Sequence, residues 1–104
     1  MRDVHLLATS CTAFGKRPDD SFRDLTREAY LAVLRDGGLE NGDDIGMSWF
    51  GNCGMGSFGQ RNIRGQVCFT PLVQEGLFPE RVGMINVEGG CATASLAFPV
   101  PGRT

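Results

Sequence analysis

Residues 81–98 of the chain spell RVGMINVEGGCATASLAF. The first part of this stretch, residues 81–88, is mostly apolar and rich in β-branched side chains, which predicts a buried strand. The pair Gly89-Gly90 then permits a sharp turn. Small side chains in residues 91–98 predict a helix, and two prolines shortly afterwards end it. A strand, a tight turn and a helix in this order indicate part of an α/β domain.

The rest of the chain continues the same alternation. Residues 4–9 (VHLLAT) predict a first buried strand, and residues 45–50 (IGMSWF) predict a second. A helix is expected between them over residues 22–36, where apolar side chains recur at helical spacing after the capping residue Ser21. A further helix is expected over residues 63–77.

The expected order is therefore strand, helix, strand, helix, strand, helix. This β-α-β-α-β-α order predicts an α/β fold, with a mostly parallel sheet, right-handed crossovers and helices on both faces. Three strands alone would leave exposed sheet edges. Pro71 must either start or kink the second helix, because its ring removes a hydrogen-bond donor.

Length and composition narrow the class of protein. The 104 residues suit one domain or part of one, and 41% apolar with 21% charged residues is typical of a globular chain. The formal net charge of −2 makes nucleic acid and anionic membrane surfaces poor partners. No apolar run approaches the roughly 18 residues of a membrane span. Four dispersed cysteines without a signal-peptide pattern indicate reduced thiols and a cytoplasmic protein.

Cys91 is the candidate nucleophile. At the start of a helix, free amide groups and the helix dipole favour a thiolate, and the two preceding glycines allow a substrate carbonyl to approach the backbone. The Cys91 amide could then donate to an oxyanion formed in acyl transfer. The alternative is that the thiol merely fills space beside small neighbours.

A thiol at this position would need a base. The helix terminus contributes roughly 0.3 to 1 kcal/mol, which is less than one pKa unit, so a cysteine with a pKa near 8.5 stays mostly protonated at neutral pH. The chain has one histidine, His5, and nothing in the sequence places it near Cys91.

Two other patterns point to weaker alternatives. Residues 54–59 (GMGSFG) match the spacing G-x-G-x-x-G, which is typical of a dinucleotide site, but they follow the second predicted strand and a flexible loop is preferred. Cys53, Cys68 and Cys11 match no compact ligand spacing, so no metal site is expected.

Residues 86–95 (NVEGGCATAS) resemble the nucleophile segment of the thiolase family, especially its sterol-carrier-protein-like acetyl-CoA acetyltransferase branch. The typical pattern there is N-V-E, two small residues and C-A-S-G-S, so Thr93 and Ala94 replace the usual Ser and Gly. The likeness continues in family order through the predicted strands, the loop near Phe14 and the first helix, and covers nearly the whole chain.

The resemblance implies a function and a fold. The cysteine that corresponds to Cys91 accepts the acyl group of an acyl-CoA thioester and passes it to CoA or to the carbanion of a second acyl-CoA, with no bound cofactor. The fold implied has two similar α/β halves stacked in five layers. This chain is similar to the first part of the first half: residues 1–98 are expected to form a partial thiolase-like N-terminal domain, and residues 99–104 an irregular Pro/Gly tail.

The family's later histidine motifs and second cysteine are absent from this sequence, so the isolated chain is expected to be inactive and truncated. The resemblance also implies a homo-oligomer, either a dimer or a tetramer, or association with a missing second half. The related β-ketoacyl synthases are less similar around Cys91, which favours acyl-CoA as the donor. The alternative from another class is a noncatalytic binding or assembly module that pairs with a second chain.

Overall fold

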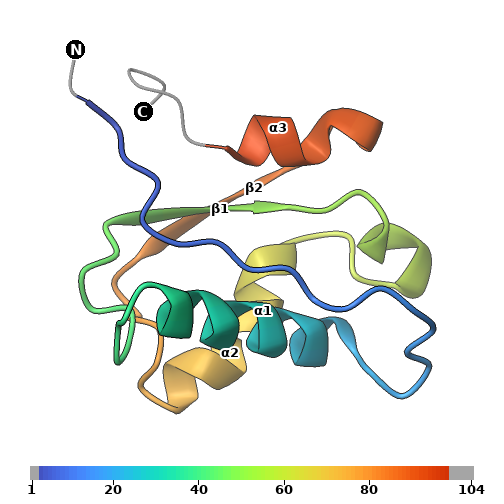
Figure 1. The fold of residues 1–104 in the computed structure, drawn as a ribbon. Coiled ribbons are helices and arrows are strands. Elements are labelled where there is room, and N and C mark those ends of the chain that lie inside the picture. The colour runs from blue at the N-terminus through green and yellow to red at the C-terminus, as the bar shows by residue number, and fades with distance from the viewer. Residues whose placement is uncertain (1–2, 99–104) are drawn as a thin grey trace. The chain divides into compact units, whose positions relative to one another are not determined.

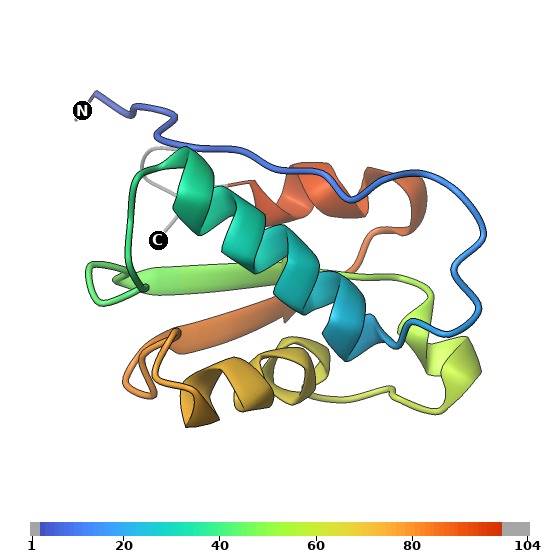
Figure 2. The same ribbon diagram turned by 60° about the horizontal axis from the view of Figure 1, so that its bottom comes forward.

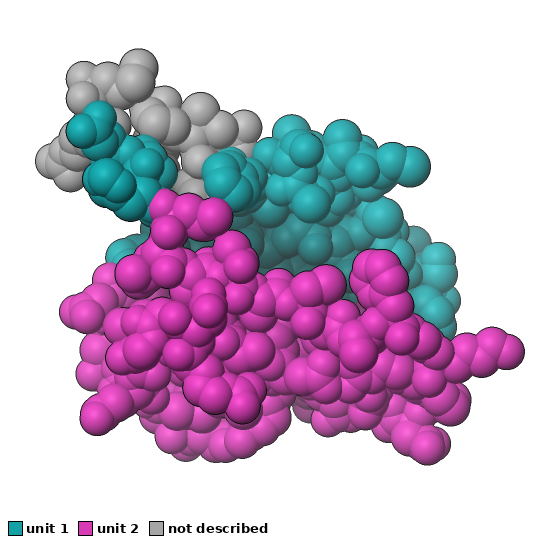
Figure 3. Space-filling view, viewed as in Figure 1, with its two compact units in different colours: residues 1–5, 46–67, 81–104 teal, residues 6–45, 68–80 magenta. Residues whose placement is uncertain are grey.

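The computed structural model describes residues 3–98, and the predicted tail over residues 99–104 lies outside the described residues. The chain divides into two compact units (Figure 3). We name the described residues within 1–5, 46–67 and 81–104 the sheet unit, and residues 6–45 and 68–80 the helix unit. The elements in chain order are α1 (Phe22–Asp36), β1 (Met47–Gly51), α2 (Arg64–Gln74), β2 (Gly83–Val87) and α3 (Thr93–Ala97) (Figure 1). Short 3₁₀ helices lie at Met55–Phe58 and Gly90–Ala92.

The sheet unit is built on two parallel strands. β1 pairs with β2 in the register Met47 opposite Gly83 through Gly51 opposite Val87, and Figure 2 shows the two strands side by side. Because α2 lies between them in the chain, this part is a β-α-β unit, which confirms the predicted parallel pairing. The strands begin two residues later than predicted.

Neighbouring atoms leave no room for a side chain at Gly51, the last residue of β1, or at Gly65 in α2. A Cβ on Gly51 would lie 2.9 Å from Cγ2 of Thr93 in α3, so the glycine lets α3 pack against β1. A Cβ on Gly65, the second residue of α2, would lie 2.6 Å from Cβ of Phe50. The Gly65 amide also donates to Oδ1 of Asn86 at 2.7 Å, which fastens the start of α2 to β2.

The predicted strand over residues 4–9 is wrong, and the described sheet has two strands instead of three. Val4, Leu6 and Leu7 are 59%, 70% and 71% exposed. A strand requires hydrogen bonds to a neighbouring strand, and within residues 3–98 this apolar run pairs with none. An apolar run alone does not reveal whether a partner strand is present.

In the helix unit, α1 has the predicted bounds because its end signals are local. Ser21 forms a capping box with Asp24: the Ser21 hydroxyl accepts from the Asp24 amide at 3.1 Å, and the Asp24 carboxylate accepts from the Ser21 amide at 2.9 Å. Hydrogen bonds to the Asp24 carboxylate, first from the Ser21 amide and then from the Ser21 side chain, lower the pKa of Asp24. α2 is shorter than predicted and contains Pro71 within its helical residues.

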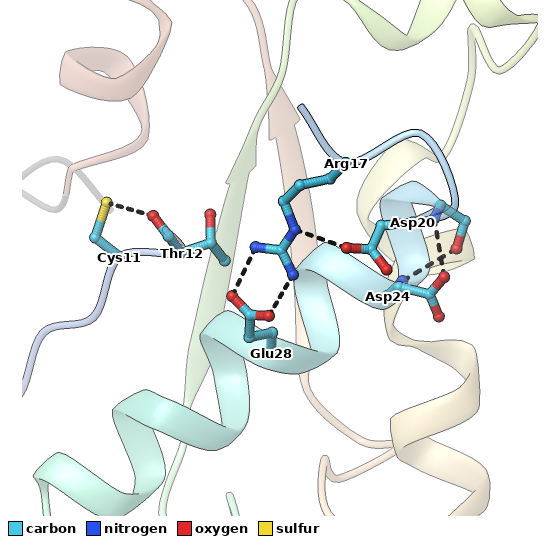
Figure 4. Close-up of polar contacts among 7 residues, drawn as sticks. Cys11, Thr12, Arg17, Asp20, Asp24 and Glu28 are labelled. Carbon is cyan, nitrogen blue, oxygen red and sulfur yellow. Dashed lines mark hydrogen bonds and ion pairs between the residues drawn. The ribbon is translucent and has the colours of Figure 1, made fainter. Parts of the chain in front are cut away.

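A salt-bridge cluster ties the preceding loop to α1. The Arg17 guanidinium contacts Asp20 at 2.6 Å and forms two hydrogen bonds with Glu28 (Figure 4). The hydrogen bonds from Arg17 lower the pKa of Glu28.

Three aromatic rings form the centre of the helix unit. The centroid of the Tyr30 ring lies 5.4 Å from that of Phe69 and 5.8 Å from that of Phe78, and both pairs are edge-to-face. The Tyr30 hydroxyl donates to the Leu77 carbonyl at 2.6 Å, so its polar end is satisfied although the residue is buried. Burial, followed by the nearby Asp43 carboxylate, raises the pKa of Tyr30.

Candidate functional site

Cys91 lies on the 3₁₀ turn Gly90–Ala92, which Glu88 and Gly89 separate from the carboxyl end of β2. Its thiol is free and the residue is exposed. In open parallel α/β sheets, ligands bind outside the carboxyl ends of the strands. Within the described residues, Cys91 is therefore not buried among its small neighbours.

The Thr93 side chain fastens the turn that carries Cys91. Thr93 is 7% exposed, and its hydroxyl donates to the Gly90 carbonyl at 2.7 Å while it accepts from the Gly89 amide at 3.0 Å. Both hydrogen bonds join residues on the N-terminal side of Cys91 to a buried group on its C-terminal side. The backbone on either side of the thiol is therefore held by one side chain.

Gly90 and Glu88 contribute to the same turn. Gly90 has a φ of +56°, a left-handed conformation that glycine adopts at little cost. Its amide donates to the Glu88 carboxylate at 2.6 Å. The backbone conformation thus favours glycine at position 90. The Glu88 carboxylate accepts a hydrogen bond from the Gly90 amide, which would otherwise be unpaired in this turn.

The helix that was predicted to begin at Cys91 begins instead at Thr93 and ends at Ala97. Cys91 therefore lies in the turn before a five-residue helix, where the dipole is weaker than in the predicted residues 91–98. The Ala92 and Thr93 amides donate to the Gly89 and Gly90 carbonyls. The Cys91 amide has no acceptor among residues 3–98.

Of the other cysteines, Cys53 belongs to the sheet unit with Cys91, whereas Cys11 and Cys68 belong to the helix unit. Cys11 and Cys53 are exposed free thiols, and Cys68 is buried at 1% exposure. His5 is exposed, and no hydrogen bond within the described chain joins it to Cys91. No group of three or more His, Cys, Asp or Glu residues in the described ranges is arranged to hold a metal ion.

The glycine-rich residues 54–59 do not form a dinucleotide-binding turn. Met55–Phe58 is a 3₁₀ helix whose first residue is buried at 2% exposure. Gly59 ends it with a φ of +97°, and the next α-helix starts only at Arg64. A dinucleotide fingerprint needs a helix that opens at the third glycine, so this geometry disfavours that alternative.

Sequence reasoning missed the part played by Thr93, which it treated only as a replacement within a small-residue helix. The available signal was a hydroxyl side chain that closely follows two glycines, because Ser and Thr commonly hydrogen-bond to nearby backbone groups. The part played by Glu88 had no comparable signal, since its contact depends on the conformation of Gly90.

Within the described residues, no helix combines the length and the apolar character that crossing a membrane requires.

Comparison with known proteins adds a second line of evidence. No family model and no solved structure matches the sequence. The chain is 37% identical over 100 residues to an acetyl-CoA acetyltransferase of Methanothermobacter thermautotrophicus, and 35% identical over 99 residues to one of Methanocaldococcus jannaschii. Each alignment covers 94% of this chain and 24% of the relative. Nearly all of the chain is therefore similar to about a quarter of proteins named acetyl-CoA acetyltransferase.

Proposed function

We propose that this chain is the nucleophile-bearing N-terminal segment of a thiolase-type acyltransferase, and that Cys91 carries the acyl group. The proposal includes the sterol-carrier-protein-like branch suggested by residues 86–95. Its substrate is a coenzyme A thioester. The observation that carries the proposal is an exposed thiol on a fixed turn at the end of a parallel strand, in a chain similar to acetyl-CoA acetyltransferases.

The proposed step is a thioester exchange. The Cys91 thiolate attacks the carbonyl carbon of the acyl-CoA thioester, and the carbonyl oxygen becomes an oxyanion. The Cys91 amide, which has no acceptor among residues 3–98, donates to that oxyanion. The carbon–sulfur bond to CoA then breaks, CoA leaves as a thiolate that takes up a proton, and Cys91 holds the acyl group as a new thioester.

The second step returns the acyl group to an acceptor. A CoA thiolate, or the carbanion of a second acyl-CoA, attacks the acyl-cysteine and releases Cys91. Both steps need a group that accepts and returns protons, and His5 shows no link to Cys91 among the described residues. We therefore expect this chain alone to be acylated once, slowly, without turnover.

Acyl labelling tests the nucleophile. The full chain is incubated with acetyl-CoA, and peptide mass spectrometry locates the thioester. We expect acetyl groups to accumulate on Cys91 faster than on Cys53 or Cys11, which are also exposed. Cys91→Ser should abolish the dominant label, and Cys53→Ser should leave it unchanged. Equal labelling of all three exposed cysteines would mean that exposure alone explains the reaction, and it would contradict the proposal.

A chimera tests the complete reaction. This chain replaces the aligned quarter of the Methanothermobacter thermautotrophicus relative, so that the rest of that protein supplies the groups this chain lacks. We expect acetyl transfer by the chimera and its loss in the Cys91→Ser variant. A chimera that folds and retains activity after Cys91→Ser would overturn the assignment of the nucleophile.

A noncatalytic assembly module is the second candidate, and the exposed face of β2 favours it. Ile85, in the middle of that strand, is 44% exposed, and Leu96 of α3 is 42% exposed. Parallel sheets are usually covered on both faces. Sedimentation velocity of the full chain tests this candidate. A concentration-dependent dimer or tetramer would support association, and a monomer at all concentrations would contradict it.

A further inference from the structure

A pocket of about 170 Å³ opens in the sheet unit at the carboxyl end of β2. It is lined by residues from the end of β2 and from the segment that leads into α2, namely Arg61, Ile63, Arg64, Asn86, Val87 and Glu88. The pocket therefore lies at the edge of the sheet where ligands of parallel α/β proteins bind. Its lining includes Glu88, which also contacts the turn that carries Cys91.

The two arginines of the pocket differ in how they are held. The Nε of Arg64 donates to the Arg61 carbonyl at 3.1 Å, and its Nη1 donates to the Asn52 carbonyl. These bonds fix the guanidinium while leaving its Nη2 group without a partner in the described chain. The Arg61 guanidinium has no ion-pair partner among residues 3–98. The Arg64 guanidinium is thus held in position by the protein itself, and the Arg61 guanidinium is not paired with a carboxylate among residues 3–98.

The charged side chains that line the pocket give it a net positive charge. Glu88 is its one acidic side chain, against two arginines. No ion pair in the described residues joins Glu88 to either arginine, and its Oε2 instead accepts from the Gly90 amide. An arginine that is fixed and incompletely paired is suited to an oxyanion with several acceptor oxygens.

Backbone strain lies at the same place. Ile63 has a φ of +43°, which is rare for a β-branched residue, and its side chain is 59% exposed. Burial of the side chain therefore does not explain the conformation. Strained backbone of this kind concentrates at ligand-binding segments. Here the strained residue separates the two arginines and lines the pocket with them.

We propose that this pocket binds a phosphate group. The volume of about 170 Å³ has room for one phosphate group. Arg64 and Arg61 supply the charge-assisted hydrogen bonds. The phosphate could belong to coenzyme A or be free inorganic phosphate. The choice of coenzyme A rests on the proposed function, whereas phosphate binding itself does not.

Binding titrations of the full chain test the pocket. Calorimetry is performed with inorganic phosphate, with coenzyme A and with pantetheine, which has the thiol arm of coenzyme A without phosphates. We expect phosphate and coenzyme A to bind competitively, and pantetheine not to displace phosphate. Arg61→Gln should weaken both by about tenfold, because a charge-assisted hydrogen bond is lost. The Arg61 carbonyl, which holds Arg64, is unaffected by this change.

Two further variants make the test specific. Glu88→Gln removes the one negative charge of the lining, so phosphate should bind more tightly. Arg35→Gln, in the last turn of α1, removes a cation that does not line the pocket and should leave the affinity unchanged. Equal weakening by Arg61→Gln and Arg35→Gln would overturn the pocket, because it would show only a general charge effect. Absence of phosphate and coenzyme A binding would overturn it as well.

These experiments can contradict the proposed function without contradicting phosphate binding, and the reverse. Cys91→Ser should retain phosphate binding, since Cys91 does not line the pocket. Acyl labelling of Cys91 without any binding of phosphate would support Cys91 as the nucleophile and contradict the proposal that the pocket binds phosphate. Binding of phosphate that coenzyme A does not displace would support the phosphate site and show that its ligand is free phosphate, not coenzyme A.

Discussion

The hydroxyl of Thr93 donates to the carbonyl of Gly90 at 2.7 Å, across the residue that bears the candidate nucleophile. The same oxygen accepts from the Gly89 amide at 3.0 Å. Because Thr93 is buried, these groups have little access to water if the hydroxyl is removed. The geometry of the Cys91 turn therefore depends on a side chain that does not itself take part in the proposed chemistry.

Thr93→Val tests this dependence, since valine keeps the shape of the side chain and removes the oxygen. We expect the free energy of unfolding to fall by about 1 to 3 kcal/mol, because a donor and an acceptor of the turn are left unsatisfied. Urea denaturation measures the change. Thr93→Ser keeps the hydroxyl and should cost less. Equal losses for the two variants would show that the methyl group, and not the hydroxyl, stabilises the turn.

Gly51→Ala tests the contact between β1 and α3. The added Cβ would lie 2.9 Å from Cγ2 of Thr93 and 3.2 Å from Cβ of Ala97, so α3 must move away. We expect a loss of about 1 to 3 kcal/mol in thermal or urea unfolding. Gly46→Ala is the matched control because nothing lies within 4 Å of its added Cβ, and it should change stability by less than about 0.5 kcal/mol.

Tyr30→Phe should change both the stability and its dependence on alkaline pH. Burial raises the pKa of Tyr30 above its usual 10.0 and Asp43 raises it further, so the folded protein keeps this proton to higher pH than the unfolded chain. The resulting stabilisation is complete below pH 10 and is lost as the pH rises through the higher folded pKa. Urea midpoints measured between pH 7 and the alkaline limit report this loss.

In the Tyr30→Phe variant the alkaline decrease should be smaller. At neutral pH the variant should lose roughly 0.5 to 1.5 kcal/mol, because the hydrogen bond to the Leu77 carbonyl is removed. That carbonyl still accepts from the Gly42 amide at 3.0 Å, which limits the cost. An unchanged alkaline slope would contradict the assignment of this titration to Tyr30.

Glu28→Gln should weaken the dependence of stability on acidic pH. The hydrogen bonds from Arg17 lower the pKa of Glu28 below its usual 4.5, so this carboxylate stabilises the fold above that pH. The stabilisation disappears as the pH falls through the lower folded pKa. Thermal melts between pH 6 and pH 2 measure the change. Glu40→Gln removes an equal charge where no ion pair is found in the described residues, and it should retain the acid dependence.

Local signals were sufficient for part of the fold. α1 begins and ends where the sequence predicts, because its capping box lies within residues 21–24 and its helical spacing lies within the helix itself. The parallel pairing of β1 and β2 follows from two apolar runs separated by a helix. The prediction that Cys91 is a nucleophile likewise depends on its neighbours, two glycines and small side chains.

Other features depend on contacts between distant residues. Residues 4–9 have the composition of a buried strand but remain outside the described sheet, since a strand needs a partner that composition does not reveal. The phosphate pocket brings Arg61 to the end of β2, and its shape depends on the crossover that precedes that strand. No local pattern contains this information.

The sequence by itself determined α1, the β-α-β order and the position of Cys91 after a glycine turn, because each depends on residues a few positions apart. Only the tertiary structure decided where α3 begins and that Arg61 and Arg64 share a pocket with the end of β2. The physical reason is that these features require close packing and hydrogen bonds between segments, such as Gly51 with Thr93, whose approach no single segment specifies.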